Sequence, residues 1–403
     1  MSQREQRIRA LARLAVQVGV NLQRGQTLAL NAMVEHAPLV RAIAAEAYAA
    51  GARYVDVYYA DQHVRRAHIE HASDDELGFS PPWLVERIRR IGETGSALIS
   101  ITGNPEPELY ADLDGSRVGR ARMRKLAEEA LKLTDGLSNW SIVPYPNEGW
   151  ARTVFGEPDV DRLWDAVAAA IRIDEPDPVA AWQEHIAKLQ LRADSLNKRH
   201  FDHLRYRGPG TDLTVGLHPG SEWKAALDVS RGIEHVANMP TEEVFTAPDA
   251  RRVEGVVRST LPLQIQGTIV RDLTVRFEDG RAVEVTASTG EEVMRTHVAT
   301  DEGAARLGEV ALVDSDSRVG KTGLVFYDTL FDENASSHIA LGASIVNAVS
   351  WAADVSPEER SVRGVNHSSI HTDFMIGSPE LEVDGVDAHG EAVPILRHGD
   401  WQL

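Results

Sequence analysis

Helix and strand patterns alternate along the first half of this chain, and this alternation limits the folds open to it more than any other feature. Runs of β-forming residues lie at 27–30, 54–59, 97–101 and 141–144. Apolar residues recur at helical spacing before, between and after these runs, at 5–19, 37–50, 82–93, 119–134, 158–172 and 177–197. Strands that alternate with helices of about 10–15 residues are typical of an open α/β unit with a mostly parallel sheet.

The pattern changes in the second half of the chain. Residues 211–217 and 273–285 alternate apolar and polar side chains with period two, which is typical of half-buried strands. Asp279-Gly280 lies within the second run and indicates a tight hairpin. We therefore predict an α/β domain over residues 1–195, followed by an α+β, β-rich domain over residues 196–403.

Composition excludes several classes of function. The chain has 42 Lys and Arg against 61 Asp and Glu, a net charge of −19, which argues against binding to nucleic acid or to an anionic membrane surface. It has no cysteine, so disulfides, cysteine-ligated zinc and thiol nucleophiles are excluded. No stretch approaches the ~18 apolar residues of a membrane span, and residues 1–7 lack the apolar centre of a signal peptide. A cytoplasmic protein is expected.

Three common functional motifs are absent or incomplete in this sequence. Gly320-Lys321-Thr322 resembles the end of a phosphate-binding loop, but Ser315 stands where that motif requires glycine. Neither a Gly-x-Ser-x-Gly elbow nor a His-Glu-x-x-His helix occurs. Nucleotide binding, serine hydrolysis and helix-type zinc proteolysis therefore lack their local signatures.

Acidic and imidazole side chains gather in four short segments between residues 238 and 375. His371 and Asp373 are two residues apart in a strand-like stretch, so both side chains project from one face. Glu309 interrupts an apolar run, where a carboxylate is costly to bury unless it is paired or bound to a cation. The candidate set is Glu243, Glu309, Glu333, His338, His371 and Asp373. Its four carboxylates and two neutral imidazoles would be neutralised by two divalent cations, and they suit Zn²⁺, Co²⁺ or Mn²⁺ better than Ca²⁺.

An ordinary interpretation of the same residues also exists. A single Glu or His is more often a solvated or hydrogen-bonded surface group than a metal ligand. His367 fits that description or supports a neighbouring ligand, and Glu242-Glu243 fits a polar loop. From the residues alone, both interpretations stay open.

The four segments, in this order and spacing, resemble the aminopeptidase T / aminopeptidase S family of bacterial metallo-aminopeptidases. The matching segments are 238–248, 308–313, 331–338 and 371–377, and the resemblance covers nearly the whole chain. It implies an N-terminal α/β domain, a C-terminal domain with a dinuclear metal site, a homodimer, and release of N-terminal residues from short peptides. It also implies that all six candidates are metal ligands, whereas Glu242 is not transferred.

One position departs from the family pattern. Family members usually carry a tyrosine seven residues after the histidine that matches His338, and this chain has Ile345 there. A phenol that could hydrogen-bond a bound water or a developing oxyanion is thus replaced by an aliphatic side chain. Loss of one such donor typically costs ~2.7–4 kcal/mol of transition-state stabilisation. Tyr327 is a candidate to substitute for it.

Three functions fit these features. The first is a metallo-aminopeptidase, or another amide hydrolase, in which two metal ions activate a water molecule. The second is a mononuclear Fe(II) ring-cleaving oxygenase, because His338, His371 and Asp373 form a two-histidine, one-carboxylate set. A single iron would not need the three glutamates of the candidate set, which argues against this alternative. The third is a metal-binding protein without turnover.

Overall fold

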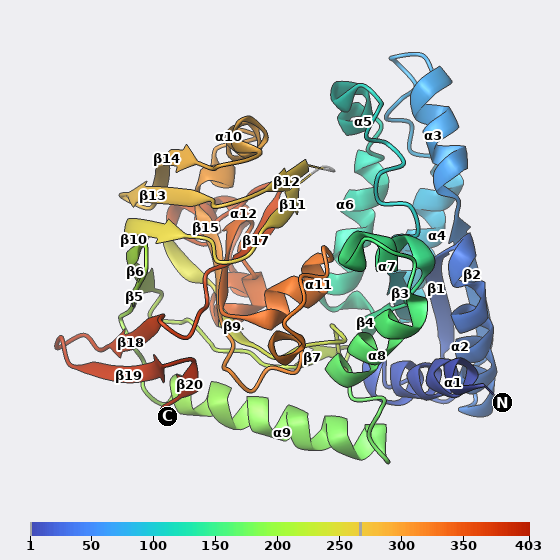
Figure 1. Ribbon diagram of the computed structural model, residues 1–403, viewed down its shortest axis with the longest axis horizontal. Helices are drawn as coiled ribbons and strands as arrows, with labels where there is room; N and C mark the ends of the chain where they lie inside the picture. The colour runs from blue at the N-terminus through green and yellow to red at the C-terminus, as the bar shows by residue number, and fades with distance from the viewer. Residues whose placement is uncertain (1, 266–267) are drawn as a thin grey trace. The chain divides into compact units, whose positions relative to one another are not determined.

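The computed structural model describes residues 2–265 and 268–403, which divide into two compact units (Figure 1). The first unit comprises the residues up to Glu184 together with Leu227–Pro240, and the second comprises His185–Ala226 together with Thr241–Leu403. Among the described residues, no helix is long and apolar enough to cross a membrane.

The first unit is built on a four-stranded sheet with the order β2-β1-β3-β4. Its strands are β1 (Thr27–Met33), β2 (Tyr54–Ala60), β3 (Ala97–Thr102) and β4 (Trp140–Pro144). All three neighbouring pairs are parallel, which confirms the predicted parallel α/β architecture. Leu28, Ala29 and Leu30 are all fully buried, as expected for a strand that is covered on both faces.

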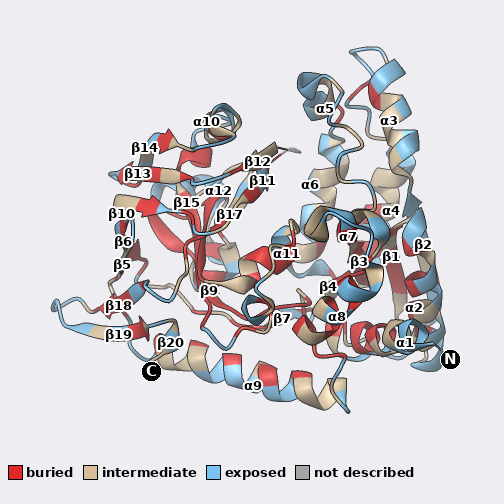
Figure 2. Cartoon of the chain, viewed as in Figure 1, coloured by how far each residue is buried: buried red, intermediate tan, exposed pale blue. Residues whose placement is uncertain are grey.

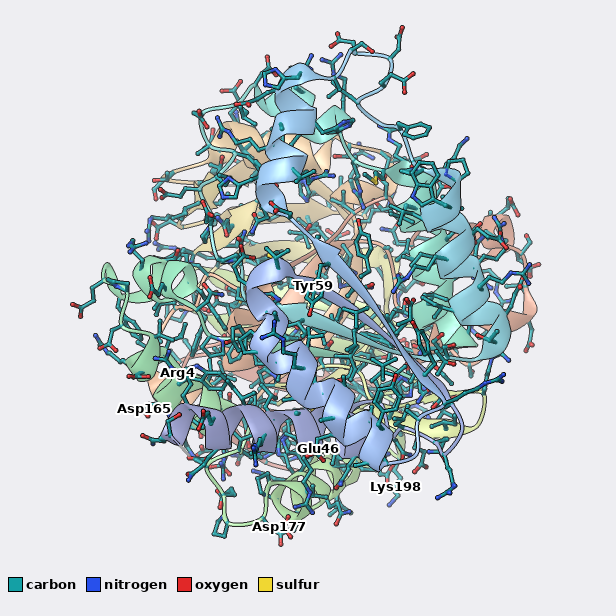
Figure 3. All side chains as sticks on the ribbon, turned by 90° about the vertical axis from the view of Figure 1, so that its right-hand side faces the viewer. Arg4, Glu46, Tyr59, Asp165, Asp177 and Lys198 are labelled. Carbon is teal, nitrogen blue, oxygen red and sulfur yellow. The ribbon has the colours of Figure 1, made fainter. Side chains whose placement is uncertain are left out.

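Helices and one hairpin complete this unit. The helices are α1 (Gln3–Leu14), α2 (Ala37–Ala49), α3 (Gln62–His71), α4 (Pro82–Thr94), α5 (Gly115–Arg120), α6 (Arg124–Lys132), α7 (Glu148–Phe155) and α8 (Val160–Ala170), and α9 (Pro178–Asn197) begins within it. The hairpin consists of β7 (Leu227–Ser230) and β8 (Ile233–Val236). Ion pairs join α1 to α8, from Arg4 to Asp161 at 2.6 Å and from Arg7 to Asp165 at 2.5 Å; Figure 3 labels Arg4 and Asp165.

The single helix predicted at 119–134 is wrong, because α5 and α6 are separate helices. Ala121 lies between them and is buried against Ile69 and Leu77. Its carbonyl oxygen accepts a hydrogen bond from the Arg65 guanidinium rather than continuing a helical ladder. These contacts come from distant residues, so the helical spacing on either side gave no sign of the break.

The second unit is dominated by antiparallel sheets. The larger sheet has eight strands in the order β14-β13-β10-β6-β5-β18-β19-β20, and a smaller one has four strands in the order β17-β16-β15-β9. The strands are β5 (His203–Gly208), β6 (Thr211–Leu217), β9 (Val244–Thr246), β10 (Pro248–Arg258), β11 (Leu263–Ile265), β12 (Thr268–Val270), β13 (Thr274–Glu278), β14 (Arg281–Thr286), β15 (Leu307–Leu312), β16 (His338–Gly342), β17 (His371–Met375), β18 (Glu382–Val386), β19 (Ala392–Arg397) and β20 (Asp400–Trp401). Short helices connect them, namely α10 (Glu291–Val298), α11 (Thr329–Asp332) and α12 (Pro357–Val362). The β-rich character predicted for this half is confirmed.

The turn between β13 and β14 follows the sequence prediction. Asp279 and Gly280 both have positive φ, at 48° and 75°. A two-residue hairpin loop of type I′ needs positive φ at both positions, and Asp-Gly adopts this conformation at low cost.

The four-stranded sheet has one face in the apolar core. Val310, Ile339 and Phe374, from its three longest strands, are fully buried in the main cluster of apolar side chains of the second unit (Figure 2). Successive side chains of a strand point to opposite faces. Residues one position away from these three therefore project from the other face, where the candidate metal ligands lie.

Candidate functional site

Strand register places four candidate ligands on one face of the small sheet. Glu309 of β15 is opposite Ala340 of β16, and Ala340 is opposite Asp373 of β17. Residues that are directly opposite share a face, as do residues two apart along a strand. His338 is two residues from Ala340, and His371 is two residues from Asp373, so both imidazoles project with the two carboxylates. Ala340, which lies between the two carboxylates, is fully buried.

The ligand atoms form two groups of three that share Glu309. We call Glu243, Glu309 and His338 the inner group, because all three are buried, and Glu309, His371 and Asp373 the outer group. Within each group the ligand atoms lie within 4.8 Å of one another. The two oxygens of Glu309 face different histidines, Oε1 at 4.0 Å from His338 Nε2 and Oε2 at 3.0 Å from His371 Nε2. The structure thus brings together five of the six predicted residues.

Both histidines present the same ring nitrogen to the carboxylates. His338 Nδ1 lies 3.3 Å from the carbonyl oxygen of Ser336, and His371 Nδ1 lies 2.8 Å from that of Ala343. A carbonyl oxygen can only accept, so each Nδ1 donates, and the Nε2 of a neutral imidazole carries the lone pair.

These lone pairs face groups that also accept hydrogen bonds. His338 Nε2 lies 3.0 Å from Glu243 Oε2, and His371 Nε2 lies 3.0 Å from Glu309 Oε2. Two acceptors at this separation require a shared proton or a cation bound to both. A fixed tautomer with Nε2 free is also the usual arrangement of a metal-binding histidine. The residues therefore fit divalent cations.

The electrostatics of the carboxylates agree with this fit. Burial raises the pKa of Glu309, against the opposing effect of the hydrogen bond from His371. Burial also raises the pKa of Glu333 well above its usual value, and the charges of Asp373 and Glu243 raise it further. Burial opposes ionisation of Asp373 as well, but the neighbouring His371 lowers its pKa overall. The cluster thus holds more negative charge than its imidazoles balance, and bound cations would relieve the excess.

The imidazoles respond in the opposite sense. Burial disfavours a charge on His338, but the hydrogen bond to Glu243 and the surrounding carboxylates raise its pKa well above its usual value. The carboxylates of Asp373 and Glu309 likewise raise the pKa of His371 well above its usual value, although burial acts against the charge. Without a cation, each histidine would hold the proton that a metal ion would replace.

Glu333 lies outside both groups of three. It follows α11 at the start of a short 3₁₀ turn, and its pKa responds to the charges of Asp373 and Glu243. The next residue, Asn334, is fully buried and links two parts of the site. Its Nδ2 lies 3.4 Å from Glu333 Oε1, and its Oδ1 accepts a hydrogen bond of 2.7 Å from the backbone N–H of Glu242. We did not single out Asn334 from the sequence, because nothing in its local pattern indicates this contact.

Glu242 and Glu243 are both buried but face different partners. The Glu242 carboxylate lies 3.7 Å from His185 Nε2, whereas Glu243 faces His338. His185 Nε2 is also 2.8 Å from the carbonyl oxygen of Thr241. Glu242 therefore lies behind the inner group, as expected for adjacent residues of an extended segment.

Ile345 occupies an apolar environment. It is half-buried and packs against a cluster that includes Ala247, Ala348 and Val349. It lies two residues after Ala343, whose carbonyl oxygen orients His371. An aliphatic side chain is therefore accommodated close in sequence to the outer group.

Gly308 provides a first test of this geometry. A Cβ at Gly308 would lie 2.2 Å from the carbonyl oxygen of Ala343, the same atom that holds His371 Nδ1. We expect Gly308→Ala to displace this carbonyl and to weaken metal binding by roughly 10–100-fold, as changes around ligands commonly do. Metal affinity and the kcat/KM of the purified variant measure the effect.

Gly119→Ala is the matched control, because nothing lies within 4 Å of a Cβ at Gly119 in α5. It should leave metal affinity and kcat/KM unchanged. If Gly308→Ala matched this control, the Ala343 carbonyl would not be needed to orient His371.

Comparison with known proteins finds similarity along nearly the whole chain. A family model described as thermophilic metalloprotease (M29) matches residues 4–401. Aminopeptidase T of Thermus aquaticus is 45% identical over 401 residues, covering 98% of both chains. Aminopeptidase AmpS of Bacillus subtilis (strain 168) is 39% identical over 406 residues, again covering 98% of both chains.

Two solved structures resemble this chain to very different degrees. Wild-type AmpT from Thermus thermophilus has a TM-score of 0.92 and 43% sequence identity, covering 98% of this chain and 99% of that one. A 2,5-dihydroxypyridine dioxygenase from Pseudomonas putida KT2440 has a TM-score of 0.53 and 12% identity, covering 100% and 98%. At this low identity, the second likeness shows a shared fold alone.

Proposed function

Because the chain belongs to the thermophilic metalloprotease family (M29), we propose that it is a metallo-aminopeptidase whose inner and outer groups each hold one divalent ion. The proposed ions are Zn²⁺, Co²⁺ or Mn²⁺. The proposed ligands are Glu243, Glu309, Glu333, His338, His371 and Asp373. Glu333 is the outlying member of this set, so its removal should weaken binding less than removal of Glu309.

One observation carries the proposal. In each group an imidazole Nε2 lies 3.0 Å from a carboxylate oxygen while Nδ1 of the same ring is held by a backbone carbonyl. Two such pairs, joined by the shared Glu309, form two adjacent positions for cations. A mononuclear iron site would use only His338, His371 and Asp373 and would leave the glutamates without a partner of opposite charge.

The chain's own residues divide the work of the site. When bound, the metal ions lower the pKa of a water molecule and polarise the scissile carbonyl. Glu309 contributes one oxygen to each group and so links the two groups. His371 is 34% exposed, whereas His338 is 1% exposed, so the outer group is the side from which substrate approaches.

The substrate we propose is a short peptide or a small amide with a free N-terminal amine. The net charge of −19 attracts a protonated amine. We also propose a homodimer, which rests on the resemblance of this chain to its family. Neither nucleic acid nor a membrane surface is a proposed partner, because clustered positive charge is what such partners require.

Metal content and hydrolysis, measured together, test the proposal. Protein purified without chelator should contain two divalent ions per chain by mass spectrometry, and it should hydrolyse amino-acid p-nitroanilides in a reaction that EDTA abolishes. This outcome would also show that Ile345 is tolerated in place of a tyrosine. Two ions without turnover would instead indicate a binding protein, and a single iron would overturn the peptidase function.

A further inference from the structure

The outer group depends on a segment without regular structure. His371 and Asp373 lie at the start of β17, directly after residues 366–370, which form neither helix nor strand. In the inner group, Glu309 lies within β15 and His338 is the first residue of β16, and these are the two central strands of the small sheet. Contacts that hold residues 366–370 in place therefore also position two of the three outer ligands.

Asp301 holds this segment through both of its carboxylate oxygens. Oδ1 accepts hydrogen bonds from Ser368 Oγ at 2.8 Å and from the backbone N–H of Ala304 at 2.9 Å. Oδ2 accepts from the backbone N–H of Ser369 at 2.8 Å and from Ser369 Oγ at 2.7 Å. Hydrogen bonds to an ionised acceptor are roughly twice as strong as neutral ones. Asp301 is thus the main polar anchor of the segment.

The Asp301 carboxylate is ionised at neutral pH. Burial opposes its charge, but the hydrogen bonds from Ser369 and Ser368 hold the pKa of Asp301 at about 2. Its effect on the segment is therefore constant from mildly acidic to alkaline pH.

Neighbouring contacts support the same segment from both ends. His297 Nε2 lies 2.7 Å from Thr372 Oγ1, between the two outer ligands. The Asn366 amide donates to the carbonyl oxygen of Gly303 at 2.7 Å. A Cβ at Gly303 would lie 2.0 Å from the carbonyl oxygen of His367, so the two segments are in close contact. The stretch from α10 to Ala305 therefore braces the entry to β17.

We propose that Asp301 is a positioning residue for the outer group, which sets the affinity of that group for its divalent ion without touching the ion. The inference rests on the proposed two-ion function. It makes the affinity for the outer ion depend on Asp301, whereas the affinity for the inner ion does not. Loss of Asp301 should release the segment that carries His371 and Asp373 and leave the inner group intact.

Variants that isolate each group provide the test. Glu243 belongs only to the inner group and His371 only to the outer group. Glu243→Gln therefore leaves the outer group, and His371→Gln leaves the inner group, for titration of the metal-free protein with Co²⁺, followed by visible absorption. Adding Asp301→Asn should weaken Co²⁺ binding in the Glu243→Gln background by roughly 10–100-fold. In the His371→Gln background it should leave Co²⁺ binding nearly unchanged, because only the inner group is then complete and its ligands do not lie on the segment that Asp301 holds.

Asp114 offers a matched control in the first unit. Its Oδ1 accepts from Ser116 Oγ at 2.6 Å and from the backbone N–H groups of Ser116 and Arg117 at 2.8 and 3.1 Å. Asp114→Asn removes the same kind of anchor and should leave both Co²⁺ affinities unchanged. The double variant Ser368→Ala/Ser369→Ala should reproduce the effect of Asp301→Asn, and combining the two should add little.

Saturating metal separates positioning from catalysis. At high Co²⁺, Asp301→Asn in the otherwise native enzyme should regain most of its kcat, because the ligands themselves are intact. Equal weakening of both groups, or no weakening of either, would overturn the role of Asp301 while leaving the two-ion function standing. A native enzyme that binds only one Co²⁺ would overturn the two-ion function itself, and this inference with it.

Discussion

Glu309→Gln is expected to abolish hydrolysis and to remove both metal ions, because Glu309 is the one residue common to the inner and outer groups. The amide keeps one oxygen but loses the charge, and its NH₂ group cannot act as a ligand. Both groups then lose a carboxylate oxygen at once. We expect kcat/KM to fall by far more than the ~10–100-fold that is typical of residues around a metal site. Metal content by mass spectrometry and p-nitroanilide hydrolysis provide the measurements.

Glu242→Gln is the control for this substitution. Glu242 and Glu309 are 4% and 5% exposed, so both substitutions replace an equally buried carboxylate with an amide. Glu242 faces His185 rather than either group, and its variant should retain both ions. If Glu309→Gln kept two ions and normal activity, Glu309 would not be a ligand.

Removal of the metal ions with a chelator should also lower the melting temperature, and more at alkaline than at neutral pH. An ion present at about 1,000 times its dissociation constant stabilises the folded state by roughly 4 kcal/mol. For a domain of about 200 residues, each kcal/mol corresponds to roughly 2–4 °C in Tm. A loss of about 8–16 °C for each ion is therefore expected. Calorimetry before and after EDTA treatment measures the change.

The pH dependence of the chelated protein follows from the raised pKa values at the site. The pKa values of Glu309, Glu333, His338 and His371 all lie above their ordinary values, so the folded state binds protons that the unfolded state releases. Stability from such groups is fully present below their unfolded pKa and is lost as pH rises through the folded pKa. The lowered pKa of Asp373 acts only near its ordinary value of 3.8 and is constant at neutral pH. The chelated protein should therefore lose stability as pH rises above the ordinary pKa values of these groups, 4.5 for the glutamates and 6.5 for the histidines.

Two comparisons make this second prediction specific. In the metal-loaded protein the cations take the place of the bound protons, so its Tm should vary much less over the same pH range. The Glu309→Gln variant should show little response to EDTA, since it has no ions to lose. A native protein whose Tm is unaffected by EDTA would contradict metal binding at these groups.

Local patterns in the sequence were sufficient to predict most of the secondary structure. Hydrophobic spacing over the first 200 residues predicted four parallel strands and most of their helices, because burial of one helix face or both strand faces is encoded residue by residue. Asp279-Gly280 predicted its hairpin for the same reason, since a two-residue turn depends only on its own backbone conformation. The break between α5 and α6 was missed, because Ala121 is held by Ile69 and Arg65, which are distant in sequence.

The identity of the candidate ligands was also readable from the sequence, whereas their arrangement was not. A carboxylate in an apolar strand, such as Glu309, needs a compensating charge wherever the chain folds, so its chemistry alone singled it out. Its place as the shared member of two groups depends on the register that sets Glu309, Ala340 and Asp373 abreast across three strands. Asn334 and Asp301 act through hydrogen bonds to segments far along the chain, and polar residues in connecting segments carry no local mark of such contacts. The sequence determined which side chains need a partner of opposite charge or a hydrogen bond. Tertiary structure decided which residue provides it, because pairing across a sheet is set by the packing of the whole unit.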